Sequence, residues 1–208
     1  MQPMPAAMPM FPLGTVLFPH GVLPLHVFEP RYRALTARCL ADSAVFGVVL
    51  IERGSEVGGG DHRFAVGTTA RIVQAGRVVD GRWVLVTVGE QRVRVSQWLL
   101  DDPYPIADVD VLDEHGGPTA AALIPDIGRA LQRLLALRTE LGESGPGVDV
   151  TLDDDPVRAS FEACALASLG PFDAQQLLEL DDTAERLTRL AELVDEETTV
   201  LELRLAEG

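Results

Sequence analysis

Apolar and polar residues follow one period in the first half of the chain and another in the second. Residues 92–98 and 107–112 alternate polar and apolar side chains, as half-exposed strands do, whereas residues 45–52 form a run of strand length that is apolar up to Glu52. Residues 64–74 and 83–88 predict two more strands flanking a tight turn at Asp80-Gly81. So many short strands predict a small, strongly bent sheet or barrel.

The second half has a helical period. Apolar residues recur three or four positions apart from Thr119 to Leu141: Leu123, Ile127, Leu131, Leu134, Leu135 and Leu137. Asp155-Pro156 predicts the start of a helix that runs towards Leu169.

Two further helix starts resemble capping boxes. Asp173 with Gln176 predicts a short helix that ends near Leu180, and Asp182 with Glu185 predicts a final helix. The final helix is expected to bury four apolar side chains: Leu187, Leu190, Val194 and Leu201. Four helices of these lengths predict a compact bundle. The breaker cluster at 114–118 lies between the two patterns, so we expect a β-rich unit over 1–112 and a helical unit over 119–208, an α+β fold.

The first 28 residues contain no Asp, Glu, Arg or Lys. Their six prolines exclude a continuous helix, and they offer neither the basic leader of a secretion signal nor the roughly 20 apolar residues of a membrane span. We expect extended segments at 10–18 and 22–28, joined by a turn at His20-Gly21. Pro30 then opens a helix over 31–41, with four side chains on its inner side: Tyr32, Leu35, Cys39 and Leu40.

Residues 12–33 form the most specific motif, Pro-Leu-x-x-x-Leu-Phe-Pro-x-x-x-Leu-Pro-Leu-x-x-Phe-Glu-Pro-Arg-Tyr-Arg. This opening motif resembles the start of the amino-terminal, substrate-binding domain of Lon proteases. The resemblance continues through residues 46–52, 66–72 and 89–95, with a weaker echo at 177–187. The chain is thus identified as similar to a stand-alone Lon amino-terminal domain.

The resemblance implies a PUA-like first unit and recognition of unfolded or tagged polypeptide segments, in a groove between the sheet unit and the helices. The residues that would contact a peptide in the motif are Phe28, Glu29, Arg31 and Tyr32. A structural role for Glu29 and Arg31 is the competing interpretation: a local ion pair or backbone hydrogen bonds at the turn into the helix. Docking on a separate protease complex is a variant of the binding hypothesis.

Charge and composition argue against several classes of function. The net charge is −15, and residues 1–112 contain 10 Arg against 11 acidic residues, so the rest of the chain carries almost all of it. Such a charge opposes nucleic-acid binding. All 17 basic residues are arginine, and the absence of lysine excludes a P-loop and a Ser–Lys dyad, so the ATPase and peptidase sites of a complete Lon protease are not in this sequence.

The residues that could bind a metal or act as a nucleophile do not occur in a known metal-binding or catalytic motif. The four histidines lack metal-ligand spacing, the serines lack a Gly-x-Ser-x-Gly setting, and Asp149 with 153–155 lacks the calcium-loop framework. The glycine-rich segment 53–62 reads as a connection, because a strand follows it instead of a helix. Cys39 and Cys164 read as small buried side chains of a reduced, cytoplasmic protein.

We therefore expect no catalytic residue, metal, cofactor or membrane partner. A hydrolase that reuses the fold, with a site assembled from distant residues, stays open as the alternative.

Overall fold

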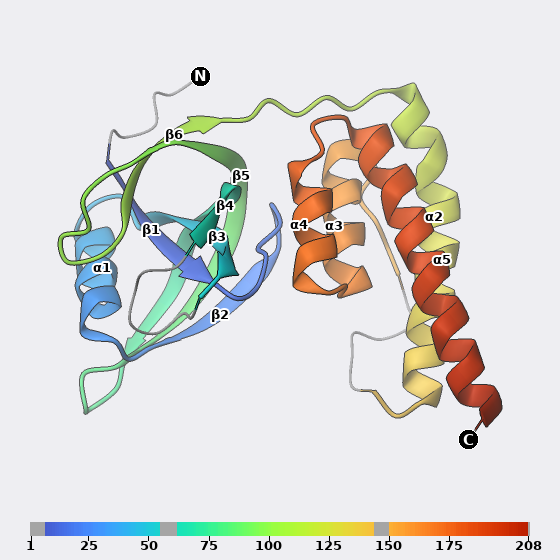
Figure 1. The fold of residues 1–208 in the computed structure, drawn as a ribbon, viewed down its shortest axis with the longest axis horizontal. Helices are drawn as coiled ribbons and strands as arrows, with labels where there is room; N and C mark the ends of the chain where they lie inside the picture. The colour runs from blue at the N-terminus through green and yellow to red at the C-terminus, as the bar shows by residue number, and fades with distance from the viewer. Residues whose placement is uncertain (1–6, 55–61, 144–149, 208) are drawn as a thin grey trace. The chain divides into compact units, whose positions relative to one another are not determined.

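The computed structural model describes residues 7–54, 62–143 and 150–207. Most of the predicted connection 53–62 and the middle of the link after Gly142 lie outside these residues. Within them the chain forms six strands and five helices and divides into two compact units, Met1–Asp113 and Glu114–Gly208 (Figure 1). The six strands and one helix belong to the first unit, and the other four helices belong to the second. The predicted α+β class is confirmed.

The sheet of the first unit closes on itself. Its strand order is β2-β5-β4-β3-β1-β6, and β6 pairs with β5 as well as with β1. β1 runs parallel to β3, and the other pairs are antiparallel. The strands are β1 Met8–Leu13, β2 Val22–Val27, β3 Val45–Arg53, β4 His62–Arg77, β5 Trp83–Trp98 and β6 Ile106–Val111. The expected strongly bent sheet is therefore present.

β5 corrects the sequence prediction of two strands at 83–88 and 92–98. It is one strand, and Gly89 lies near its middle because the chain before β2 crosses it closely. A Cβ on Gly89 would lie 2.3 Å from the carbonyl oxygen of Phe18, so any larger residue would push the two segments apart. The strand predicted at 10–18 is also shorter and ends at Leu13.

Helix α1, Pro30–Ala41, packs one side into the core of the first unit. The Tyr32 ring stacks on Phe11 at 4.0 Å between centroids, and Leu35 and Cys39 are buried one and two turns further on. Burial of the Leu35 side chain contributes about 1.5–3 kcal/mol. Leu40, predicted on the inner side, is exposed instead, because it lies at the edge of the face that Tyr32, Leu35, Thr36 and Cys39 bury.

The second unit consists of α2 Pro118–Glu140, α3 Pro156–Ala167, α4 Pro171–Glu179 and α5 Thr183–Glu207. α2, α3 and α4 each begin at a proline, where the missing N–H has no helical partner to lose. Asp155 caps α3 as predicted, since its Oδ1 accepts hydrogen bonds from the backbone N–H groups of Val157 (2.8 Å) and Arg158 (3.2 Å).

The two predicted capping boxes have different outcomes. Asp182 Oδ1 accepts from the backbone N–H of Glu185 at 2.9 Å, which confirms the start of α5. Asp173 does not cap α4, because that helix begins at Pro171 after the N-cap residue Gly170. Asp173 lies inside the first turn, where its negative charge faces the positive end of the helix dipole.

Candidate functional site

The end of the opening motif forms the corner between β2 and α1. Glu29 is extended as the N-cap residue of α1, and its Oε2 accepts a hydrogen bond from Arg31 Nε at 3.0 Å. The Arg31 guanidinium carbon lies 4.4 Å from the centroid of the Tyr32 ring. This confirms the predicted local ion pair, which holds the chain as it turns into the helix.

The four residues expected to contact a peptide here differ in exposure. Phe28 is 56% exposed, whereas Tyr32 is 3% exposed and belongs to the core. The Glu29 and Arg31 side chains are mostly buried, at 16% and 17% exposed. Among these four side chains Phe28 is thus the exposed one, whereas Tyr32 lies in the core.

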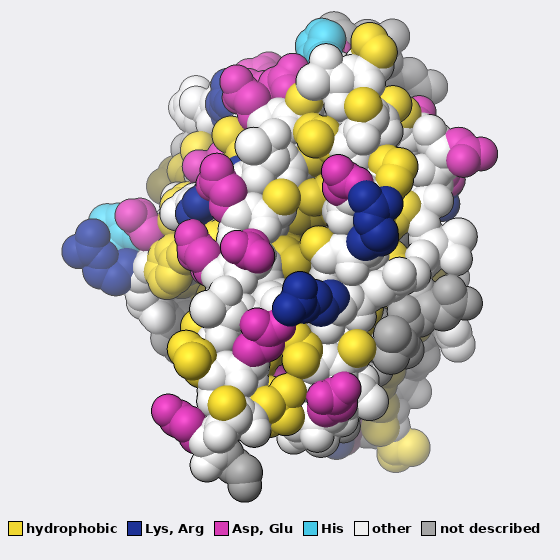
Figure 2. Space-filling model, turned by 90° about the vertical axis from the view of Figure 1, so that its right-hand side faces the viewer, with side chains coloured by type: hydrophobic (Ala, Val, Ile, Leu, Met, Phe, Trp, Pro, Cys, Tyr) yellow, Lys and Arg dark blue, Asp and Glu magenta, His cyan; other side chains and the backbone are white. Residues whose placement is uncertain are grey.

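An apolar groove of about 440 Å³ lies between α2 and α5 in the second unit. Ile127, Leu187 and Val194 are buried along its floor, and the half-buried Ala130 and Ala191 line it as well. Figure 2 looks onto this side of the protein and shows hydrophobic side chains gathered along the middle of the face, with charged side chains beside them. We call this feature the α2–α5 groove.

Charged groups of the α2–α5 groove lie at its edges. Asp126 and Arg133 line it from α2 and Asp195 lines it from α5, and all three are exposed. Arg133 forms an ion pair with Glu202. The helical period of the sequence identified the buried floor but not the groove. A small residue such as Ala130 leaves a hollow only if the residues opposite it on α5 do not fill the space, and the sequence does not show which residues those are.

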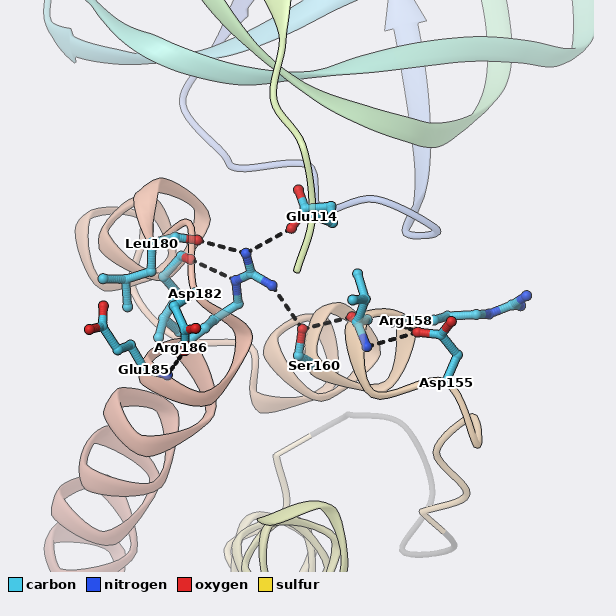
Figure 3. Close-up of polar contacts among 10 residues, drawn as sticks. Glu114, Asp155, Arg158, Ser160, Leu180, Asp182, Glu185 and Arg186 are labelled. Atoms are coloured by element: carbon cyan, nitrogen blue, oxygen red, sulfur yellow. Dashed lines mark hydrogen bonds and ion pairs between the residues drawn. The ribbon is translucent and has the colours of Figure 1, made fainter. Parts of the chain in front are cut away.

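A buried arginine fixes the end of the helical unit. Arg186 is fully buried, and its guanidinium donates to Ser160 Oγ (2.9 Å), to Glu114 Oε2 (3.1 Å), and to the carbonyl oxygens of Leu180 (2.6 Å) and Leu177 (3.3 Å) (Figure 3). We call this set the Arg186 network. It joins α3, the α4–α5 junction and the first residue of the unit.

The Arg186 side chain also makes an aromatic contact, with its guanidinium carbon 4.0 Å from the centroid of the Phe161 ring. The helical spacing of apolar residues did not identify Arg186, because an arginine in an amphipathic helix is normally exposed.

The described residues offer little reactive chemistry. Burial raises the pKa of the Cys39 thiol to about 12 and that of Cys164 to about 12, so both stay protonated at neutral pH and are poor nucleophiles. Ser160 Oγ donates to the Val157 carbonyl oxygen at 2.7 Å, so this hydroxyl is engaged within the Arg186 network. In the ranges 7–54, 62–143 and 150–207, no three His, Cys, Asp or Glu residues gather as metal ligands, and no helix is long and apolar enough to cross a membrane.

Comparisons with known proteins agree on one family. Residues 7–196 match the model of the ATP-dependent protease La (LON) substrate-binding domain. "Lon protease 2" of Herpetosiphon aurantiacus is 32% identical over 205 residues, which cover 94% of this chain and 24% of that protein. "Lon protease" of Cytophaga hutchinsonii is 28% identical over 207 residues, 96% of this chain and 25% of that protein. The chain therefore spans about a quarter of the length of these relatives.

Solved structures show the same fold. The Lon N-terminal domain protein from Xanthomonas campestris superposes with a TM-score of 0.63 at 26% identity, covering 89% of this chain and 97% of that one. The N-terminal domain of Mycobacterium avium complex Lon protease gives a TM-score of 0.67 at 23% identity, covering 91% and 98%, and supports the fold alone. Because the family model matches most of its length, the chain belongs to the LON substrate-binding domain family.

Proposed function

We propose that this protein is a non-catalytic module that binds apolar segments of unfolded or tagged polypeptides in the α2–α5 groove. The observation that carries the proposal is the groove itself, with its buried apolar floor and its charges confined to the edges. Membership of a substrate-binding domain family supports a role in recognition. Phe28, exposed at the corner of the first unit, is proposed as a separate apolar contact, held in place by Glu29, Arg31 and Tyr32.

The groove suits a few apolar side chains of a longer chain. A volume of about 440 Å³ lies within the range of ordinary binding pockets. Each apolar side chain that a peptide buries there contributes about 1.5–3 kcal/mol, and ordering the peptide offsets part of this gain. We therefore expect binding in the micromolar range, with apolar content of the peptide as the main determinant.

The proposed module would bind a polypeptide without cleaving it. Because both cysteine thiols are protonated and buried, neither supports hydrolysis of a bound chain. The module would hold a polypeptide or present it to a separate protease complex. The hydrolase alternative gains no support from the described residues.

Fluorescence anisotropy with a labelled, permanently unfolded polypeptide tests the proposal. Ala130→Glu places a charge in the α2–α5 groove and is expected to weaken binding about tenfold or more, because a buried carboxylate next to apolar side chains is costly. Ala122→Glu makes the same change on the exposed side of α2 and is the matched control. Phe28→Ala is measured alongside.

Two results would count against the proposal. The first is absence of binding to unfolded polypeptide at high micromolar protein, and the second is equal affinity of the Ala130 and Ala122 variants. Thermal melts of both variants show whether the helical unit stays folded.

A further inference from the structure

The first unit carries a second hollow, of about 430 Å³, whose chemistry differs from that of the α2–α5 groove. It lies between α1 and the hairpin that joins β4 to β5. Its lining includes Pro30, Arg33 and Ala37 from α1 and Arg77, Gly81 and Trp83 from the hairpin. We call it the arginine pocket.

Both arginines of the pocket are held by the fold. A Cβ on Gly81 would lie 2.4 Å from Arg33 Nη2, so the guanidinium rests directly on the backbone of the turn. Gly81 has a φ of +85°, a conformation that glycine adopts without strain. Arg77 lies opposite Trp83 in the β4–β5 register, with its guanidinium carbon 5.8 Å from the centroid of the indole ring.

Two neighbouring carboxylates, those of Glu29 and Asp80, already have partners. Glu29 accepts from Arg31, and Asp80 Oδ2 accepts from Arg82 Nε at 2.6 Å while its Oδ1 accepts from the Arg82 backbone N–H at 3.0 Å. Arg33 acts on Asp80 only as a more distant charge, and among the described residues neither the Arg33 nor the Arg77 guanidinium forms an ion pair. The two guanidinium groups therefore line the same hollow, and no carboxylate among the described residues is bound to them.

The net charge of the segments around the pocket is positive, whereas that of the whole chain is negative. Residues 29–42 and 77–83 together contain five arginines and three carboxylates, in a protein whose net charge is −15. A guanidinium binds a carboxylate through two parallel hydrogen bonds, and it also stacks on aromatic faces. Trp83 and Ala37 add apolar walls beside the two forks. A large polyanion is disfavoured by the total charge, whereas a single carboxylate on a polypeptide is not.

We propose that the arginine pocket binds a carboxylate of a polypeptide ligand, either its free carboxyl terminus or an Asp or Glu side chain, beside an apolar residue. Arg33 and Arg77 would hold the carboxylate, and Trp83 would contact the apolar neighbour. This inference rests on the proposed function for the nature of the ligand, but its site is distinct from the α2–α5 groove.

Nuclear magnetic resonance of the full chain tests the pocket with small probes. The indole N–H signal of Trp83, assigned with a Trp98→Phe variant, is followed during titration with N-acetyl-phenylalanine, with its amide, and with N-acetyl-phenylalanyl-glutamate amide. We expect saturable shifts with one or both carboxylate probes and at least about tenfold weaker binding of the neutral amide, because the charge-assisted hydrogen bonds are lost. The first probe represents a free terminus and the last a side chain.

Variants separate the pocket from general charge. Arg33→Gln and Arg77→Gln are each expected to weaken the carboxylate probes about tenfold. Arg38→Gln, an exposed change on α1 outside the pocket, removes the same charge and is expected to leave binding unchanged. Thermal melts confirm that each variant is folded.

Three outcomes would overturn the inference: equal binding of the acid and amide probes, equal effects of the Arg33 and Arg38 variants, or inorganic phosphate binding as tightly as the carboxylates. Each leaves the proposed function standing, since Ala130→Glu tests that separately with unfolded polypeptide. Conversely, a protein that binds no unfolded polypeptide but prefers the acid probe at Trp83 would refute the proposed function and retain the pocket as a carboxylate site.

Discussion

Replacing Arg186 with methionine removes the guanidinium of the Arg186 network while keeping an unbranched side chain in the same space. Three neutral acceptors, Ser160 Oγ and the carbonyl oxygens of Leu177 and Leu180, lose a donor, at about 1 kcal/mol each. The bond to Glu114 is charge-assisted and contributes about 1.5–3 kcal/mol.

Two effects reduce this cost. The buried methionine regains about 1.5–3 kcal/mol of apolar burial, and the Glu114 carboxylate, 22% exposed, can take up water. We expect a net loss of about 3 kcal/mol in the free energy of unfolding, at the low end of what removal of one partner from a buried ion pair costs.

Urea unfolding followed by far-ultraviolet circular dichroism measures this loss, because most of the helix belongs to the second unit. Arg189→Met is the matched control on the same helix. Arg189 pairs with Glu192 at 2.8 Å, but it is 36% exposed and its partner 56%, so its removal should cost less than about 1 kcal/mol.

A third variant, Ser160→Ala, tests coupling. Combined with Arg186→Met it should cost less than the two single changes together, because both remove the same hydrogen bond. A loss below about 1 kcal/mol for Arg186→Met, equal to that of the control, would refute the reasoning. It would show that apolar packing alone holds α3 against the α4–α5 junction.

Two further predictions concern single groups. Asp155→Ala should lower stability in urea by about 1 kcal/mol through loss of the α3 cap, and the exposed neighbour Asp154→Ala should not. Cys39 and Cys164 should resist a thiol reagent at pH 8 until urea unfolds the chain. Because their folded pKa values are raised from 9.0 to about 12, stability should fall as pH rises through that window, and less so in a variant with both thiols replaced by alanine.

The sequence predicted local features of the fold best. The Asp155 and Asp182 caps and the buried Leu131, Leu134, Leu187 and Leu190 follow from rules that act within a few residues, although the same rules wrongly predicted a cap at Asp173. Features set by distant partners were missed. The continuity of β5 depends on how closely the chain at Phe18 approaches Gly89, and no local pattern reports that approach.

The candidate sites show the same division. The ion pair of Glu29 and Arg31 was predictable because the two residues are neighbours in the sequence. The α2–α5 groove depends on which small side chains of two helices line a common space, and Arg186 on which carbonyl oxygens surround it. A sequence shows which residue types are present, but it does not show which of them become neighbours in the folded chain.

The net charge of the chain disfavours an anionic ligand, whereas the charge around the arginine pocket favours one. For a single carboxylate we expect the local charge to have the larger effect. Residues 1–112 are almost neutral, so most of the −15 lies in the part of the chain that does not contain the arginine pocket. At physiological ionic strength the interaction between exposed charges is screened beyond about 8 Å. A carboxylate bound by Arg33 and Arg77 would therefore respond mainly to those two guanidinium groups and to Asp80 and Arg82 in the adjacent turn. A nucleic acid needs many phosphate contacts, and two arginines in a chain with a net charge of −15 do not supply them.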